Sequence, residues 1–126
     1  MLIDDDSITN FLNELLIKEM DISEELIISS DGQKALDELY NRCILKDECP
    51  DLILLDVNMP VINGFEFLKR YNEMVFDNKS SIIIVMLSTS LNPRDKEKAE
   101  TLNVKDYLNK PLSKEGMNEL LEKYFN

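Results

Sequence analysis

The chain has 126 residues, of which 44% are hydrophobic, and this fits one folded domain rather than a disordered segment. Its 25 acidic and 14 basic residues give a net charge of −11, which repels nucleic-acid phosphates and anionic lipids and argues against both as partners. The chain has no histidine, so the commonest general base, the usual zinc ligand and a phospho-histidine donor are excluded.

The two cysteines, Cys43 and Cys49, do not form a C-x-x-C pair. We expect them to be reduced thiols in or beside a helix. The longest apolar run, residues 82–87, is too short to cross a membrane, and the first residues lack the pattern of a signal peptide. The sequence therefore predicts a soluble protein of a reducing, cytoplasmic compartment without a membrane partner.

Short apolar runs typical of β-strands alternate with helical patterns along the chain, five of each. The strands are expected at residues 1–3, 26–28, 52–55, 82–87 and 106–108. The third of these runs is continuously apolar, as is typical of a strand that is buried on both faces. We expect a single domain that covers residues 1–126.

The helices are predicted from apolar residues that recur at helical spacing. The first helix is expected over residues 7–20, with this apolar side: Ile8, Phe11, Leu12, Leu15 and Leu16. The third is expected to carry Phe65, Leu68, Tyr71 and Val75. Asn92 and Pro93 predict the N-cap and first residue of the fourth helix, and Ser113 is expected to cap the last.

Strict alternation of strands and helices implies a parallel sheet with right-handed crossovers and helices on both faces. The fold class is therefore α/β, a doubly wound (βα)5 domain. For five strands the common order is 2-1-3-4-5, as in flavodoxin-like folds, with the switch point between strands 1 and 3. Ligands in such sheets bind beyond the carboxyl ends of the strands at that point, so the candidate site is expected there.

Chemically active side chains follow four of the predicted strands. They are Asp4, Asp5 and Asp6 after strand 1, Asp56 after strand 3, Ser88 after strand 4 and Lys110 after strand 5. Each residue taken alone could lie in a solvated turn. In a 2-1-3-4-5 sheet, however, all of these strand ends meet in one crevice.

Such a crevice would hold several negative charges close together. Two carboxylates about 5 Å apart repel each other by roughly 3 kcal/mol at an effective dielectric constant of about 20. A divalent cation relieves this repulsion, and oxygen ligands without His or Cys favour Mg²⁺. Lys110 could hold an anion such as a phosphoryl group, and Ser88 offers a hydroxyl donor. Together these groups indicate a phosphoryl-transfer site with a carboxylate nucleophile.

The chain resembles response-regulator receiver domains over essentially its whole length. The motifs that carry the resemblance are Asp4-Asp5, the segment Leu54–Pro60, Gly64, Leu87-Ser88 and Asn109-Lys110-Pro111. They occur in the order and with the spacing found in this family, most closely in single-domain, chemotaxis-regulator-like members. The resemblance implies a (βα)5 domain that accepts a phosphoryl group from a phospho-histidine, on a sensor histidine kinase or a histidine phosphotransfer protein.

The resemblance also implies a role for individual residues. Asp56 would accept the phosphoryl group, and Mg²⁺ would be held by Asp4, Asp5, Asp56 and the backbone carbonyl of Asn58. Lys110 would bind the phosphoryl oxygens, and the Lys110–Pro111 bond is usually cis in this family. Asp6 is a third acid, and we choose Asp4 and Asp5 because the acidic pair normally follows the strand directly.

Signalling would depend on two switch residues, Ser88 and Tyr107. On phosphorylation the Ser88 hydroxyl would move inward, and Tyr107 would turn in from a more exposed rotamer. A downstream protein would then bind the face formed by helix 4, strand 5 and helix 5, within residues 91–125. Asn58 and Ser90 occupy positions that tune the phosphoryl lifetime in this family.

Two other functions remain open at this stage. One is a Mg²⁺-dependent phosphatase with an aspartate nucleophile, although such enzymes use an acidic residue where this chain has Asn58. The other is a pseudo-receiver, which acts as an unphosphorylated scaffold. No output domain follows the predicted receiver, so we expect either signalling through protein contacts or a piece of a longer protein.

Overall fold

The computed structural model describes residues 1–89 and 92–125. Its centre is a five-stranded sheet in the order β2-β1-β3-β4-β5, and all neighbouring strands are parallel. The strands are β1 (Leu2–Ile3), β2 (Ile28–Ser29), β3 (Leu52–Asp56), β4 (Ile83–Ser88) and β5 (Asp106–Asn109). The predicted fold class and strand order are confirmed, and strand boundaries differ from the predicted ones by at most two residues.

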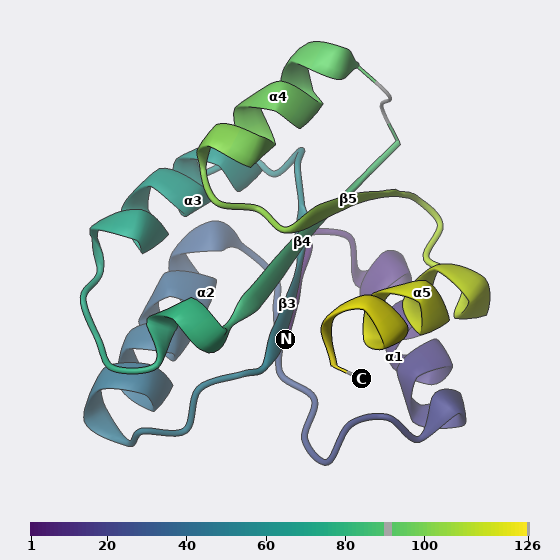
Figure 1. Ribbon diagram of the computed structural model, residues 1–126, viewed down its shortest axis with the longest axis horizontal. Helices are drawn as coiled ribbons and strands as arrows, with labels where there is room; N and C mark the ends of the chain where they lie inside the picture. The colour runs from purple at the N-terminus through teal and green to yellow at the C-terminus, as the bar shows by residue number, and fades with distance from the viewer. Residues whose placement is uncertain (90–91, 126) are drawn as a thin grey trace.

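Helices cover both faces of this sheet, with α2 and α3 on one side and α1 and α5 on the other (Figure 1). The helices are α1 (Ser7–Met20), α2 (Gly32–Leu39), α3 (Gly64–Glu73), α4 (Pro93–Thr101) and α5 (Lys114–Tyr124). A π-helical segment (Tyr40–Leu45) continues α2, and a short 3-10 helix (Lys79–Ser81) precedes β4. The result is a three-layer α/β domain.

The helices begin where the sequence predicts, because side chains satisfy the free N–H groups of the first turns. The Asn92 side chain accepts a hydrogen bond from the Arg94 backbone, and Pro93 takes the first helical position of α4. The Ser113 hydroxyl accepts one from the Gly116 N–H at the start of α5. Both predicted caps are confirmed.

The core consists of two apolar clusters, one on each face of the sheet. Ile53 and Leu55 of β3 pack into the cluster beneath α2 and α3, whereas Leu54 packs into the cluster beneath α1 and α5. Successive side chains of a strand point to opposite faces, so β3 must be apolar throughout. The prediction of a strand buried on both faces is confirmed, and the burial fixes the position of Asp56 at its end.

The predicted apolar side of α1 was wrong, although the limits of the helix were right. Ile8 and Phe11 are 67% and 59% exposed, and Leu12 and Leu15 are also exposed. The buried residues of the helix are Asn10, Asn13 and Ile17. On this side of α1 the Asn10 side chain donates a 2.8 Å hydrogen bond to the Asp4 carbonyl, so its amide group has a partner in the buried layer.

Two further expectations were wrong, one for the end of α3 and one for the two cysteines. Val75 is not part of α3, because Met74 adopts an extended conformation that ends the helix after Glu73, and Val75 is 88% exposed. Cys43 and Cys49 are not free thiols but form a disulfide, with a Cα–Cα distance of 4.7 Å. The π-helical turn and the loop that follows it bring these residues together, which the sequence spacing did not indicate.

Within residues 1–89 and 92–125, no helix combines the length and the apolar character needed to span a membrane.

Candidate functional site

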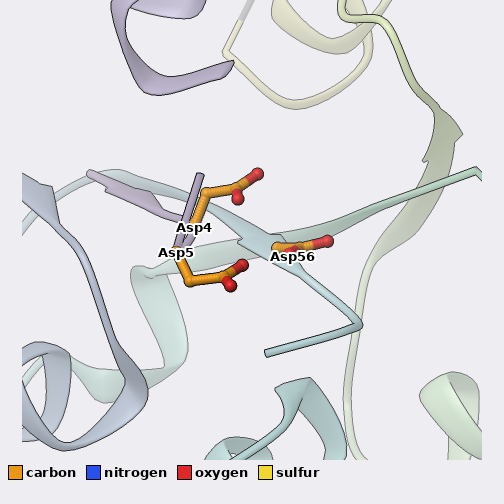
Figure 2. A group of neighbouring side chains, drawn as sticks. All are labelled: Asp4, Asp5 and Asp56. Atoms are coloured by element: carbon orange, nitrogen blue, oxygen red, sulfur yellow. The ribbon is translucent and has the colours of Figure 1, made fainter. Parts of the chain in front are cut away.

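Three carboxylates gather where β1 and β3 end. Asp4 and Asp5 directly follow β1, and Asp56 is the last residue of β3. One carboxylate oxygen from each lies within 4.8 Å of the others, and the three side chains extend toward the same side of the strand ends (Figure 2). Asp4 and Asp56 are buried, whereas Asp5 is exposed. The parallel pairing of β1 with β3 creates this cluster, because it places both carboxyl ends at one edge.

A single ammonium group contacts two of these acids. Lys110 Nζ lies 2.7 Å from Asp4 Oδ2 and 3.0 Å from Asp56 Oδ1. The backbone N–H of Lys110 donates a 2.8 Å hydrogen bond to the Ser88 carbonyl, which anchors the lysine to the end of β4. The Lys110–Pro111 peptide bond is cis, as the family resemblance implies.

The charges in the site perturb one another. Burial raises the pKa of Asp56, and the neighbouring Asp4 carboxylate adds to the rise, whereas the hydrogen bond from Lys110 opposes it. Burial alone would lower the pKa of Lys110, but hydrogen bonds to Asp4 and Asp56 outweigh it and raise that pKa. Three carboxylates against one ammonium leave excess negative charge. Their oxygen atoms are the ligands that Mg²⁺ prefers, so the cluster fits a hard divalent cation.

Asp6 has a different task from its two neighbours. Its carboxylate accepts hydrogen bonds from the Ile8 backbone and the Thr9 hydroxyl, and so caps α1. The Thr9 hydroxyl is the main reason why the pKa of Asp6 is lowered. The structure therefore groups Asp4 and Asp5 with Asp56 and assigns Asp6 to the helix cap.

Ser88 and Asn58 border the cluster. Ser88 is the last residue of β4, one position after Leu87, which pairs with Asp56, and it is only 1% exposed. Asn58 follows Asp56 by two residues and has an exposed side chain. A hydrogen bond from its backbone N–H tends to lower the pKa of Asp56. Ser90, expected to tune the phosphoryl lifetime, lies outside the described residues, and so does Leu91 at the start of the expected output face.

Tyr107, the second expected switch residue, is half-buried. Its ring packs against the apolar cluster beneath α2 and α3, and its hydroxyl is buried without a hydrogen-bond partner among the described residues. The ring therefore lies inward in this structure, and its movement on phosphorylation stays a prediction. In the sheet Tyr107 pairs with Met86 of β4.

Sequence reasoning missed how two residues support the site. Asn10 holds the Asp4 carbonyl, and an Asn inside an apolar helical pattern is a signal that could have suggested a buried polar contact. Gly64 was seen only as part of a motif. Its backbone N–H donates to the Val57 carbonyl, and a Cβ atom at this position would lie 2.6 Å from the Asp56 carbonyl oxygen. Only glycine allows α3 to approach β3 so closely.

Comparisons with known proteins agree on one family. The family model described as the response regulator receiver domain matches residues 1–122. The transcriptional regulatory protein CpxR of Escherichia coli strain K12 is 35% identical over 114 residues, which are 90% of this chain and 43% of CpxR. Hybrid signal transduction histidine kinase I of Dictyostelium discoideum is 30% identical over 114 residues, 89% of this chain but 6% of the kinase. The chain thus spans less than half of either relative.

The fold comparison gives the same result over nearly the whole chain. The crystal structure of a two-component response regulator from Cytophaga hutchinsonii superposes with a TM-score of 0.89 and 37% sequence identity. The match covers 99% of this chain and 94% of that one. The strand order, the acidic cluster at the ends of β1 and β3 and the family match lead to one conclusion. This chain belongs to the response regulator receiver domain family of two-component signal transduction systems.

Proposed function

We propose that residues 1–126 act as one receiver domain in which Asp56 accepts a phosphoryl group. The observation that carries the proposal is the shared position of Lys110, whose Nζ contacts both Asp4 and Asp56 at the edge of the acidic cluster. A carboxylate nucleophile, a cation site and a lysine that can bind phosphoryl oxygens are the parts that phosphoryl transfer needs. The donor would be a phospho-histidine of a sensor histidine kinase or a histidine phosphotransfer protein.

Asp4, Asp5 and Asp56, together with the backbone carbonyl of Asn58, would hold Mg²⁺. The convergence of three carboxylates within 4.8 Å, with one ammonium to offset them, supports this assignment. When bound, the ion would neutralise charge on the phosphoryl oxygens.

The transfer itself would use residues of this chain. A carboxylate oxygen of Asp56 attacks the phosphorus, an O–P bond forms, and the P–N bond of the donor breaks with the electron pair left on the imidazole nitrogen. Lys110 Nζ, already bonded to Asp56, would transfer that hydrogen bond to a phosphoryl oxygen. Ser88, at the end of β4, would donate its hydroxyl proton to another of these oxygens.

The product would signal rather than enter a catalytic cycle. An enzyme of the aspartate-nucleophile phosphatase class would need an acid two residues after Asp56, where Asn58 stands. We therefore assign no activity on other substrates. Ser88 and Tyr107 would report phosphorylation to the face formed by α4, β5 and α5, where a downstream protein would bind. A net charge of −11 argues against nucleic acid and membrane as partners, and the proposed compartment is the cytoplasm.

The test is labelling by a small phosphodonor. Acetyl phosphate with Mg²⁺ should add one labile phosphoryl group to the parent chain, held as an acyl phosphate and detected by intact-mass spectrometry. Asp56→Asn should take up none, whereas Asp51→Asn, a matched change at an exposed aspartate before β3, should be labelled like the parent. Equal labelling of the parent and Asp56→Asn would exclude Asp56 as the acceptor.

A further inference from the structure

The disulfide between Cys43 and Cys49 has one protected and one accessible side. Cys43 is 5% exposed and lies within the apolar cluster beneath α2 and α3. Cys49 is only partly buried and lines a cavity of about 610 Å³ at the end of the sheet where β3 begins, remote from Asp56 at the other end of that strand. Cys43 does not line this cavity. A molecule in the cavity would therefore meet Cys49 rather than Cys43.

The cavity also has a charge preference. Its charged side chains are Glu24, Glu25, Arg42, Glu48 and Asp51, four carboxylates against one guanidinium. Arg42 is already paired with Glu25 at 2.9 Å and with Glu38 at 2.7 Å. Met1 also lines the cavity, and burial lowers the pKa of its amino group to about 6, so this group adds little positive charge near neutral pH. A cationic or neutral molecule fits these surroundings better than an anion.

We propose that Cys43 and Cys49 form a reversible thiol–disulfide exchange site for a small, non-anionic thiol, with Cys49 as the attacked sulfur. The bond closes a loop with a sequence separation of only six residues, and a crosslink across so short a loop constrains the unfolded chain least. The bond therefore stabilises the fold less than one across a long loop would, and its position beside the cavity suits an exchange role. In the proposed cytoplasmic compartment, on which this step depends, disulfides are usually transient rather than structural.

The exchange balances as two successive displacements. The thiolate of the small thiol attacks the Cys49 sulfur, the bond to Cys43 breaks, and the Cys43 sulfur leaves with the electron pair and takes up a proton. A second thiol then attacks the mixed disulfide and releases Cys49 as a thiol. The protein disulfide is reduced by two electrons, and the two small thiols become one small disulfide. The same small disulfide reoxidises the pair by the reverse steps.

The direction of attack can be tested with two single variants. Each is incubated with cystamine, a small cationic disulfide, and its mass is measured intact. Cys43→Ser should form a mixed disulfide at Cys49, whereas Cys49→Ser, which keeps only the buried sulfur, should react at least about tenfold more slowly. Cys43→Ala serves as a second variant if the serine is not tolerated in the apolar cluster. Faster reaction at Cys43 would overturn the assignment.

The charge preference is tested on the oxidised parent chain with cysteamine, 2-mercaptoethanol and 2-mercaptoethanesulfonate. Each rate of reduction is divided by the rate at which the same thiol reduces a small neutral disulfide. The normalised rate should be at least about threefold higher for the cationic than for the anionic thiol at low ionic strength, and salt should remove the difference. Glu48→Gln should reduce this difference between the cationic and the anionic thiol. Glu100→Gln, a change on α4 outside the cavity, should leave the difference as in the parent.

Three results would refute the proposal. The first is a parent chain that keeps two alkylatable thiols after incubation with cystamine, since no disulfide then forms. The second is reduction at a rate independent of thiol concentration, which would mean that the bond reacts only after unfolding. The third is a normalised rate that is highest for the anionic thiol. None of these measurements involves Asp56, so labelling by acetyl phosphate tests the proposed receiver function separately.

Discussion

Lys110 Nζ and Asp4 Oδ2 lie 2.7 Å apart although 106 residues separate them in the sequence. The contact joins the loop after β5 to the end of β1 across the whole carboxyl edge of the sheet. The same ammonium bonds Asp56, so one cation is shared by two buried carboxylates. Lys110 therefore offsets the charge of two buried carboxylates and is also the lysine of the proposed phosphoryl-transfer site.

Replacing Lys110 by Met should destabilise the chain in the absence of divalent cations. The substitution leaves Asp4 and Asp56 buried without their cation, and breaking a buried ion pair in this way costs about 3 kcal/mol. Because the pKa of Lys110 is raised, its contribution is fully present below the ordinary value of 10.5 and is lost as the pH rises through the raised value.

Urea unfolding of the parent and Lys110→Met at pH 7 and above pH 10.5 measures both effects. The difference in the free energy of unfolding between the parent and Lys110→Met should be larger at pH 7 than above pH 10.5. Lys114→Met is a matched control, because Lys114 forms an exposed pair with Glu19 and should cost less than about 1 kcal/mol. Equal losses from both substitutions would contradict the shared-cation role of Lys110.

Asp56 gives a pH dependence in acid. Burial raises its pKa above the value of 3.8, so its contribution to stability is fully present below that value and is lost as the pH rises through the folded pKa. Asp56→Asn removes this ionisation. In metal-free buffer the variant should therefore gain stability relative to the parent as the pH rises from below 3.8 to neutral. Denaturant titrations at a series of pH values measure the stability of Asp56→Asn relative to the parent. If that relative stability fell as the pH rose, the hydrogen bond from Lys110 would outweigh the effect of burial on the pKa of Asp56.

Mg²⁺ should distinguish Asp5 from Asp6. A ligand present at a hundred times its Kd stabilises the folded state by about 2.7 kcal/mol. Asp5→Asn should lose most of this gain, and should be at least as stable as the parent in chelator because one repelling carboxylate is removed. Asp6→Asn should keep the gain, because asparagine caps a helix as well as aspartate does. Thermal melts with Mg²⁺ and with chelator measure the stabilisation by the metal in each variant. If only Asp6→Asn lost this stabilisation, Asp6 rather than Asp5 would be the metal ligand.

In its buried position the Tyr107 hydroxyl should lower the free energy of unfolding of the chain. It is buried without a partner among the described residues, and an unsatisfied buried polar group costs about 1–3 kcal/mol. Tyr107→Phe should therefore be as stable as the parent or more stable, by up to roughly 1 kcal/mol. Tyr124→Phe is the contrasting change, because the Tyr124 hydroxyl donates to the Lys105 carbonyl and its loss should destabilise. Urea unfolding of both variants tests this, and a clear loss in Tyr107→Phe would reveal a partner that the described residues do not show.

The sequence was informative wherever one pattern controls one feature. Alternating apolar runs predicted the sheet order, and the side chains of Asn92 and Ser113 predicted where helices start, because capping depends only on neighbouring residues. The exposed side of α1 could not be predicted from hydrophobic spacing. The side that faces the sheet carries Asn10, whose amide bonds the Asp4 carbonyl, and hydrophobic periodicity does not register such a polar contact.

The candidate site divides in the same way. Positions at strand ends were predictable because topology alone brings Asp4, Asp56 and Lys110 together. The rotamer of Tyr107 and the disulfide between Cys43 and Cys49 depend on packing between segments. No spacing rule in a single sequence encodes such packing.

Gly64 should be the position least tolerant of a methyl group. A Cβ atom there would lie 2.6 Å from the Asp56 carbonyl oxygen and 2.8 Å from Met86 Cε. The first of these is a backbone atom of Asp56, the proposed phosphorylation site, and cannot move without shifting the end of β3. Gly64→Ala should therefore destabilise the chain by about 2 kcal/mol and slow labelling by acetyl phosphate.

Gly116→Ala in α5 is the matched control. Its Cβ would meet the Ser113 hydroxyl at 3.3 Å and Leu108 at 3.8 Å, so the strain is small, and alanine favours a helix over glycine by roughly 1 kcal/mol. This variant should be at least as stable as the parent and should be labelled at the parental rate. Urea unfolding and time-resolved intact-mass spectrometry measure both quantities. If Gly64→Ala matched Gly116→Ala in stability and labelling, the close approach of α3 to Asp56 would not be needed to hold the acceptor carboxylate in place.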